Sequence, residues 1–372
     1  MRIGIPKEVK NHEARVGMTP PGVREMVQRG HEVIVQTNAG HDIGLDDPDY
    51  VAAGATIAAD AAEVFEKADM VVKVKEPQPK EIALLRDGQT LFTYLHLAPD
   101  PEQTRGLLES GVTAIAYETV TDDRGALPLL APMSEVAGRM SVQAGASGLE
   151  IIRGGRGVLL GGVPGVAPGK VVVIGGGVVG SNAALIATGM GANVTVLDKS
   201  QPRMAELDFQ FQSLITTLYS TTQAIEDAVL EADLVIGAVL VPGAAAPKLV
   251  TRDMVKEMKR GSVIVDVAID QGGCIETSRP TTHQDPYYVE EGVVHYCVTN
   301  MPGAVARTST FALNNATLPY IVRLAQRGVL DAVRTDPHIA HGLNVFGGKL
   351  THEAVAEAQG LTYTPLLEAL PK

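Results

Sequence analysis

Cysteine is nearly absent from this sequence. Its 372 residues include only Cys274 and Cys297. Two cysteines are too few for a framework of disulfides, and the spacing between them fits no pattern of metal ligands. The sequence therefore predicts two buried thiols in a reducing cytoplasm.

Positive charge is also scarce, and it is never concentrated. The chain carries 31 Lys and Arg against 43 Asp and Glu, which gives a net charge of −12 and an isoelectric point near 5.2. No run of Lys or Arg is longer than two residues. Because proteins that bind nucleic acids or anionic membranes rely on basic patches, this composition argues against both kinds of partner.

The sequence lacks the long, uninterrupted apolar run that a membrane-spanning helix requires. Its most apolar stretch, Val158 to Gly180, contains Lys170, two prolines and eight glycines, and it could not cross a bilayer as a regular helix. The N-terminal residues Met1 to Lys7 lack the apolar core of a secretory signal. We therefore expect a cytoplasmic protein with small-molecule partners.

The chain is long enough for two domains, and 45% of its residues are hydrophobic. In the first 130 residues, short β-branched runs alternate with helical patterns. The strands expected there are Arg2–Ile5, Glu32–Gln36, Met70–Lys75, Leu91–His96 and Val112–Tyr117. Such alternation is typical of a parallel sheet that is covered by helices on both faces.

A second alternation begins at Lys170 and predicts a second sheet of the same kind. Its expected strands are Val171–Ile174, Asn193–Leu197, Leu234–Ala238, Val263–Val267 and Val293–Val298. One helical segment, from Met133 to about Arg153, lies between the two alternations. Another helical pattern, from Thr308 to Leu324, follows the second alternation.

The second alternation opens with a glycine motif of the form GxGxxG, from Gly175 to Gly180. The motif follows an apolar strand and precedes a helix-length segment, and the next strand ends in Asp198. Here Gly175 permits a tight turn, Gly177 lets the backbone approach a pyrophosphate, and Gly180 lets the helix pack closely on the strand. Asp198 would accept hydrogen bonds from the adenosine ribose and repel a 2′-phosphate. The motif predicts NAD rather than NADP; the alternative is a glycine-rich turn that binds no ligand.

The predicted fold is α/β, with two doubly wound, Rossmann-like domains of parallel strands. Because the helical pattern after Thr308 has no strand of its own to cover, we expect the C-terminal part to return to the first domain. That discontinuous domain, residues 1–130 and 306–372, would bind substrate, and residues 131–305 would bind NAD. A cleft between the domains is the expected ligand site.

Polar side chains follow several expected strands at their carboxyl ends, where open parallel sheets bind ligands. Lys75 and His96 follow strands of the first domain, and Asp270 and Asn300 follow strands of the second. Together they would supply a cation, an imidazole, a carboxylate and an amide. An NAD enzyme that acts on a small anionic substrate needs residues that bind the substrate carboxylate, and it needs a general acid/base beside the nicotinamide.

These residues also have ordinary structural explanations, which the sequence leaves open. Lys75 could be a solvated surface charge, and His96 could be a core histidine bonded to a backbone carbonyl. Asp270 could cap a turn. Arg15 could simply pair with Glu13 or with the start of a helix.

Over essentially its whole length, the chain resembles the bacterial alanine dehydrogenases. The resemblance rests on segments that begin at Ile3 (IGIPKE), Lys73 (KVKEP), Thr93 (TYLHL), Pro132 (PMSEVAGR), Gly237 (GAVLVPG), Asp270 (DQGGC) and Asn300 (NMPG). It implies reversible oxidative deamination of L-alanine to pyruvate and ammonium with NAD, in a homohexamer.

The resemblance also implies a role for individual residues. Arg15 and Lys75 would bind the substrate carboxylate and carbonyl oxygen, and His96 and Asp270 would form the catalytic pair. The motif already indicates Gly175, Gly177 and Gly180 as cofactor-binding residues. The resemblance adds Ser134, Val178, Asp198, Arg203, Ser220, Val239, Leu240, Val267, Ala268, Ile269, Asp270, Val298, Thr299, Asn300 and Met301.

Two positions depart from the family pattern. Members often have lysine where Arg203 stands, and either cation can face the adenosine end of the cofactor. Some members bind magnesium through an acidic residue and a histidine at the positions of Arg323 and Arg327. Since arginine cannot be a metal ligand, we expect no metal at these positions.

By this resemblance, the clamp of Arg15 and Lys75 points the substrate Cα–H at the nicotinamide, and hydride transfer leaves an imine. His96 would then assist the addition of water and the departure of ammonia, while Asp270 orients the reacting nitrogen or water. Two alternatives remain: the NAD-binding subunit of a proton-translocating transhydrogenase, and a non-catalytic NAD-binding scaffold. Turnover of L-alanine with NAD would distinguish all three.

Overall fold

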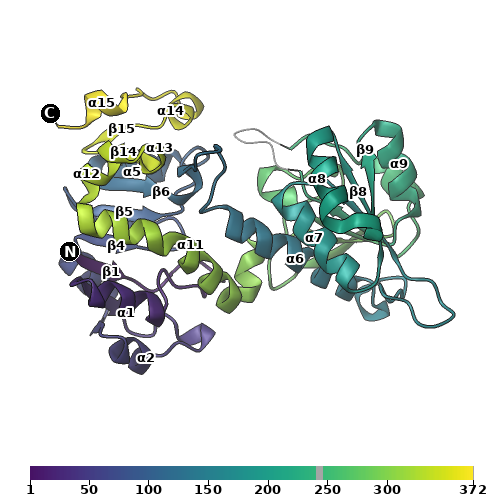
Figure 1. The fold of residues 1–372 in the computed structure, drawn as a ribbon, viewed down its shortest axis with the longest axis horizontal. Coiled ribbons are helices and arrows are strands. Elements are labelled where there is room, and N and C mark those ends of the chain that lie inside the picture. Colours follow the sequence, from purple (N-terminus) through teal and green to yellow (C-terminus); the bar gives the residue numbers. More distant parts are fainter. Residues whose placement is uncertain (240–245, 372) are drawn as a thin grey trace. The chain divides into compact units, whose positions relative to one another are not determined.

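The computed structural model describes residues 1–239 and 246–371. The chain divides into two compact units. One contains Met1–Pro132 together with Val305–Lys372, and the other contains Met133–Ala304 (Figure 1). Each unit is a sheet flanked by helices, so the predicted α/β class is confirmed.

The first unit is built on an eight-stranded sheet with the order β15-β14-β6-β5-β4-β1-β2-β3. Strands β1 to β6 are parallel, and in chain numbering their order is 3-2-1-4-5-6. They comprise Arg2–Ile5, Glu32–Gln36, Thr56–Ala58, Met70–Val72, Thr90–Thr93 and Thr113–Ala116. The sequence did not predict β3. It also did not predict β14 (Leu343–Phe346) and β15 (Lys349–Leu350), which are antiparallel and occupy one edge.

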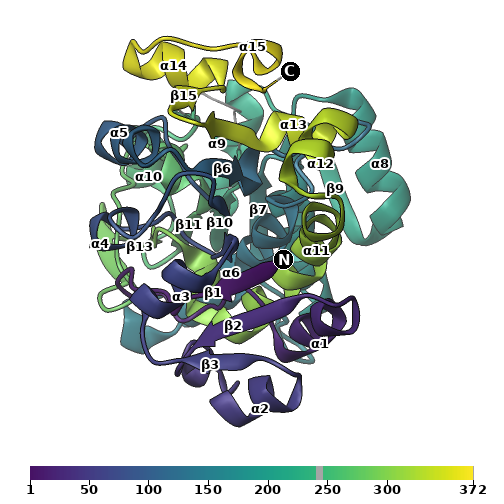
Figure 2. The same cartoon turned by 90° about the vertical axis from the view of Figure 1, so that its left-hand side faces the viewer.

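Helices cover both faces of this sheet, as the alternation predicted. Figure 2 shows α1, α11, α12 and α13 along one side and α3, α4 and α5 along the other. The first group comprises Pro20–Gln28, Ala306–Arg327, Val329–Thr335 and Pro337–Gly342; the second comprises Ala61–Lys67, Pro79–Ile82 and Pro101–Ser110. The helices α2 (Asp47–Ala52), α14 (Glu353–Gln359) and α15 (Leu366–Ala369) complete the unit.

The long helix α11 is held to the N-terminal part of the same unit. The Asn314 side chain accepts a hydrogen bond from the Thr19 backbone N–H at 3.1 Å, and Thr310 accepts one from Val16 N–H at 3.3 Å. Thr19 is also the N-cap of α1. The C-terminal segment therefore packs on the first unit, through contacts between residues almost 300 positions apart in the chain.

The second unit has seven strands in the order β12-β13-β11-β10-β7-β8-β9. All are parallel except the edge strand β12, and the sequence did not predict β9 or β12. In chain order β7 to β13 comprise Lys170–Ile174, Asn193–Asp198, Ile215–Tyr219, Leu234–Gly237, Val263–Asp266, Tyr287–Glu290 and Val293–Tyr296. The helices α6 to α10 comprise Ala131–Gly148, Val178–Gly189, Gln201–Phe211, Thr222–Glu231 and Arg252–Glu257.

The central strands of the second unit alternate between two hydrophobic cores. Val171 and Val173 of β7 contribute to one core, whereas Val172 and Ile174 contribute to the other. This follows from the two-residue period of a strand, and it explains why β7 is apolar at every position from Val171 to Ile174. Both predicted thiols are buried, Cys274 and Cys297 alike.

Three elements, β4, β5 and α6, end three or more residues earlier than the sequence predicted. Strand β4 ends at Val72 rather than Lys75, and β5 ends at Thr93 rather than His96. Beyond these ends, several backbone N–H groups donate to glutamate side chains instead of to neighbouring strands. Helix α6 ends at Gly148, and a separate 3₁₀ turn covers Ile151–Arg153.

No helix in the described ranges is both long enough and apolar enough to span a bilayer.

Candidate active site

In the first unit, three loops meet at one edge of the sheet. They follow β1, β4 and β5, which are neighbours in the order β5-β4-β1. Because the strand order reverses between β1 and β4, their carboxyl ends form the switch point at which doubly wound sheets bind ligands. The sequence candidates Arg15, Lys75 and His96 all lie on these loops.

A buried ion cluster ties two of the loops together. The Nζ atom of Lys73 lies 3.1 Å from the Glu8 carboxylate and 2.7 Å from the Glu81 carboxylate, and all three side chains are buried. The other oxygen of Glu8 accepts a hydrogen bond from Val74 N–H at 2.7 Å. Burial by itself lowers the pKa of Lys73, but the two carboxylates outweigh it and the pKa is raised. This cluster fixes the backbone on either side of Lys75.

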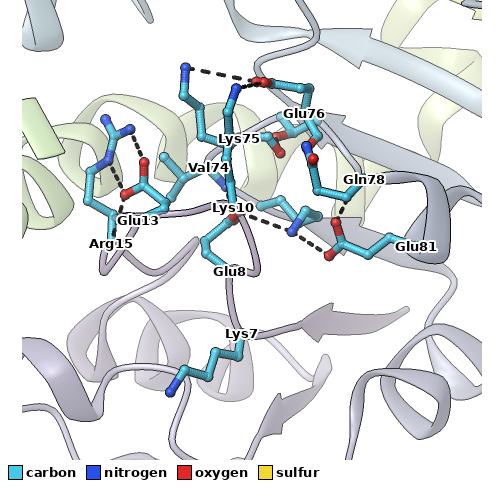
Figure 3. Close-up of polar contacts among 12 residues, drawn as sticks. Lys7, Glu8, Lys10, Glu13, Arg15, Val74, Lys75, Glu76, Gln78 and Glu81 are labelled. Atoms are coloured by element: carbon cyan, nitrogen blue, oxygen red, sulfur yellow. Dashed lines mark hydrogen bonds and ion pairs between the residues drawn. The ribbon is translucent and has the colours of Figure 1, made fainter. Parts of the chain in front are cut away.

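Arg15 lies on the loop after β1 and is almost fully buried. Its Nε atom donates to Glu13 at 2.6 Å, and a terminal nitrogen donates to the second oxygen of Glu13 at 2.5 Å. The pairing that the sequence allowed as an alternative is therefore present (Figure 3). A guanidinium carries five N–H donors, so this pairing is compatible with binding a substrate carboxylate as well.

Lys75 is not a solvated surface charge, because its side chain is only 16% exposed. The Thr93 hydroxyl donates to the Lys75 backbone carbonyl at 2.9 Å and so holds the loop against the end of β5. Burial lowers the pKa of Lys75, and the nearby Glu76 carboxylate offsets this only in part. A bound anion would stabilise the charged form of this lysine.

Glu76 lies between the cationic groups of the site. Lys10 forms an ion pair with one of its oxygens, and Lys75 lies 3.8 Å from the other (Figure 3). The Nδ1 atom of His96 lies 3.6 Å from that second oxygen, Oε2. Burial alone raises the pKa of Glu76, but the histidine and the two lysines outweigh it, and the pKa is lowered. Glu76 therefore remains a carboxylate that connects Lys75 with His96.

His96 is not a core histidine, since 45% of its side chain is exposed. It lies three residues beyond β5, and its backbone has φ +49°, in the left-handed region that residues other than glycine seldom adopt. Its ring stacks on Tyr94, with the ring centroids 5.7 Å apart. An exposed imidazole beside a buried lysine is suitable for moving protons to and from a bound anion.

In the second unit, the glycine motif forms the turn from β7 into α7, as its spacing predicted. Gly175 has φ +100°, and a Cβ atom there would lie 2.8 Å from the Ala238 carbonyl oxygen. A Cβ atom on Gly177 would meet no atom within 4 Å, so the backbone is open to a ligand there. The first turn of α7 starts at Val178 and presents backbone N–H groups that have no partner within the helix. This geometry fits a dinucleotide phosphate.

Gly180 allows the closest backbone approach in the motif. A Cβ atom there would lie 1.8 Å from the Gly175 carbonyl oxygen, which no local adjustment could accommodate. We expect Gly180→Ala to lower the thermal stability of the second unit, with a cost of about 3 kcal/mol or more from overpacking, and to abolish dinucleotide binding. Thermal unfolding and titration with dinucleotides would measure the two effects.

Gly189, at the end of the same helix, provides a matched control. A Cβ atom there would meet nothing within 4 Å. Gly189→Ala should therefore leave dinucleotide binding unchanged and cost no stability. If Gly180→Ala and Gly189→Ala had the same thermal stability and the same ligand affinity, the close packing assigned to Gly180 would be wrong.

Asp198 ends β8 and contacts the glycine loop directly. One of its oxygens accepts a hydrogen bond from Gly176 N–H at 2.6 Å, and the other accepts one from Ser200 N–H at 2.8 Å. Arg203 reaches the same loop, because its Nε atom donates to the Gly176 carbonyl at 2.7 Å. A carboxylate has about four acceptor sites, so Asp198 retains capacity for ribose hydroxyls. These contacts place Asp198 and Arg203 at the loop that the motif predicted.

The other cofactor candidates follow the carboxyl ends of parallel strands in the same sheet. Ser220 follows β9, Val239 follows β10, Val267–Gln271 forms a 3₁₀ turn after β11, and residues 298–301 follow β13. That turn contains Ala268, Ile269 and Asp270, and the last segment contains Val298, Thr299, Asn300 and Met301. Leu240 lies outside the described residues.

Ser134 reaches this edge from a helix rather than from a strand. It lies in α6, four residues before Gly138. A Cβ atom on Gly138 would lie 2.2 Å from the carbonyl oxygen of Val179, so α6 packs closely on the start of α7. Ser134 is therefore one helical turn from Gly138, which packs against the backbone of the glycine motif.

Arg323 and Arg327, which occupy the positions of the magnesium ligands of some family members, both have partners within the protein. Arg323 forms an ion pair with Asp336 at 2.5 Å, and Arg327 donates to the Thr335 hydroxyl at 3.2 Å. Throughout residues 1–239 and 246–371, no group of three or more His, Cys, Asp or Glu side chains is arranged to hold a metal ion.

The structure adds two acidic residues that the sequence analysis missed. Glu76 lies in a quoted motif, but it was not recognised as a link between Lys75 and His96. Glu118 follows the carboxyl end of β6 and accepts hydrogen bonds from the backbone N–H groups of Leu95 and His96. The rule that identified Lys75 and His96, polar residues just beyond strand ends, applies to Glu118 as well.

Both units thus have parallel strands in the order 3-2-1-4-5-6, and the second carries a dinucleotide-type glycine loop at its switch point. These features define a dinucleotide-binding α/β protein. Comparison with known proteins identifies the family. Residues 4–137 match the N-terminal domain of alanine dehydrogenase/PNT proteins, and residues 141–353 match the C-terminal domain.

Individual relatives agree with these matches. An alanine dehydrogenase from Halomonas elongata is 64% identical over 98% of both chains. A solved L-alanine dehydrogenase structure is 56% identical over 97% of this chain and 99% of its own, with a TM-score of 0.94. A transhydrogenase structure from Sinorhizobium meliloti is 25% identical over 95% of this chain and 100% of its own, with a TM-score of 0.82. The chain belongs to the alanine dehydrogenase/PNT family, and the resemblance seen in the sequence is confirmed.

Proposed function

We propose that this protein catalyses the reversible, NAD-dependent oxidative deamination of L-alanine to pyruvate and ammonium. The observation that carries the proposal is the arrangement around Glu76, where a buried lysine and an exposed imidazole both lie within 4 Å of one carboxylate oxygen. A small carboxylic acid needs such a cation to bind it and such an imidazole to move protons. Full-length relatives named alanine dehydrogenase support the same reaction.

Each residue of the first unit has a defined task in this proposal. Arg15 and Lys75 bind the substrate carboxylate and carbonyl oxygen and fix the orientation of Cα. His96 accepts a proton as water adds to the imine carbon, and it returns a proton as ammonia departs. Asp270 of the second unit orients the reacting nitrogen or water.

The family implies a nicotinamide cofactor, and we propose that it is NAD. The bound cofactor would supply hydride transfer to and from the substrate Cα. Gly175 to Gly180 and the start of α7 would hold its pyrophosphate, and Asp198 would hold its adenosine ribose. The remaining candidates at the carboxyl ends of β9 to β13, with Ser134 and Arg203, would complete its binding site.

The direct test uses purified protein. L-Alanine and NAD should give NADH and pyruvate, and pyruvate, ammonium and NADH should give the reverse reaction. The likeness to a transhydrogenase makes NAD-binding transhydrogenase function the second candidate. NADH binding without turnover of alanine would favour that candidate or a non-catalytic scaffold.

Two substitutions separate substrate binding from cofactor binding. Lys75→Ala and Arg15→Ala should each raise the KM for pyruvate by about tenfold or more, because each removes a charge-assisted contact worth roughly 1.5–3 kcal/mol. The Kd for NADH should remain nearly unchanged. Initial rates and NADH titration give both values.

Lys7 provides the matched control. It lies on the same loop as Arg15, but it pairs with Asp42 at 3.8 Å and points away from Glu76 in Figure 3. Lys7→Ala should leave both constants unchanged. Equal weakening of pyruvate and NADH binding in Lys75→Ala would point to damaged folding and would contradict the assigned clamp.

We also propose that the protein works in the cytoplasm as a homohexamer. Light scattering of the purified protein would measure the oligomeric state.

A further inference from the structure

Glu118 holds the backbone of His96 from the neighbouring strand. It lies in the 3₁₀ turn Tyr117–Thr119, directly after β6, and β6 pairs with β5. Its Oε1 atom accepts a hydrogen bond from His96 N–H at 2.6 Å. Leu95 N–H donates to both oxygens, at 3.1 and 3.2 Å. One carboxylate therefore binds two consecutive backbone amides.

These amides belong to a segment in an unfavourable conformation. His96 has φ +49°, and it is one of only a few residues other than glycine in the described chain with positive φ. Such a conformation persists only where the surroundings enforce it. The adjacent Leu95 carbonyl is also fixed, because the Gln103 side chain donates to it at 2.8 Å.

Aromatic packing holds the two segments in register. Tyr117, next to Glu118, packs edge-on against Phe92 and Tyr94, with ring centroids 4.4 and 5.1 Å apart. Tyr94 in turn stacks on the His96 ring. The turn that carries Glu118 is thus rigidly connected to the residues on both sides of the histidine backbone.

We propose that Glu118 is a positioning residue for His96. Its contacts are with the backbone amides, whereas the imidazole faces Glu76 through Nδ1. Glu118 therefore acts by fixing where the ring lies and not by exchanging protons with substrate. The inference rests on the proposed role of His96, and its test is designed to separate the two.

The test compares three substitutions of Glu118. Glu118→Gln keeps the length and an acceptor oxygen and should retain turnover within about threefold, because the backbone hydrogen bonds can still form. Glu118→Asp keeps the charge but is shorter and cannot span the same distance. Glu118→Asp and Glu118→Ala should each lower kcat by about tenfold to a hundredfold, as misplacement of a reacting group does. The KM for pyruvate and the Kd for NADH should change far less.

A second comparison asks whether the effect passes through His96. In a His96→Ala background, Glu118→Ala should cause no further loss of kcat, because the side chain to be positioned is already missing. Asp60 is a matched control, since its carboxylate also accepts a backbone hydrogen bond, from Glu63 N–H at 2.9 Å, at the start of α3. Asp60→Ala should leave kcat unchanged.

The outcomes are distinct. If the wild type does not turn over alanine, the proposed function fails; if His96→Ala is fully active, the role of His96 fails. If His96→Ala is impaired but Glu118→Asp and Glu118→Ala keep normal kcat, the positioning role is wrong. It is equally wrong if Glu118→Gln loses as much as Glu118→Ala, or if the loss persists in the His96→Ala background.

Discussion

Replacing His96 with alanine should lower kcat in both directions by on the order of a hundredfold or more, as expected when a general acid/base is removed. The ring is exposed, stacks on Tyr94 and faces Glu76, so its loss leaves no cavity in the core. Folding and NADH binding should therefore be preserved. Steady-state rates, thermal unfolding and NADH titration measure the three properties.

His41 is a suitable control for this experiment. It is an exposed histidine of the same unit that pairs with Asp46 at 2.6 Å, and it lies on the 3₁₀ turn His41–Ile43. His41→Ala should retain wild-type turnover. Near-normal turnover in His96→Ala would assign His96 a structural role only.

The second large effect concerns the choice of coenzyme. Wild type should strongly prefer NAD, since NADP would bring a phosphate against the Asp198 carboxylate. Asp198→Asn keeps an acceptor oxygen but removes the charge, and it should narrow the NAD/NADP preference by about tenfold or more, mainly through better use of NADP. Two unit charges about 4 Å apart near a protein surface repel by roughly 4 kcal/mol, and 1.4 kcal/mol is a factor of about ten.

Asp198→Ala should narrow the preference for a different reason. It removes the acceptors for Gly176 N–H and Ser200 N–H, so it should loosen the glycine loop and mainly impair NAD use. Arg203, which already contacts that loop, could then partly accommodate the phosphate of NADP. Asp208→Asn, an exposed acid on α8, is the control and should have no effect. An unchanged preference in both Asp198 variants would remove Asp198 from the coenzyme site.

Local patterns predicted most of the central strands well. The expected strands Arg2–Ile5 and Glu32–Gln36 match β1 and β2 residue for residue. The glycine motif predicted the turn into α7, and the structure adds a hydrogen bond from Gly176 N–H to Asp198. These predictions succeed because strand alternation, glycine conformations and motif spacing depend on residues close together in the chain.

Several of the errors originate in longer-range contacts. The short antiparallel strands β14 and β15 exist because β14 pairs with β6, more than two hundred residues earlier. The early ends of β4 and β5 follow from side chains that take over backbone amides. Glu8 binds Val74 N–H from 66 residues away, and Glu118 binds His96 N–H from 22 residues away.

The sequence by itself therefore determined the two α/β alternations, the dinucleotide loop, and the candidates Lys75 and His96 at strand ends. Only the tertiary structure decided that Glu76 joins these two residues and that Glu118 fixes the His96 backbone. The reason is physical: spacing along the chain specifies which residue ends a strand. Which strand ends become neighbours depends on the order in which distant strands pair.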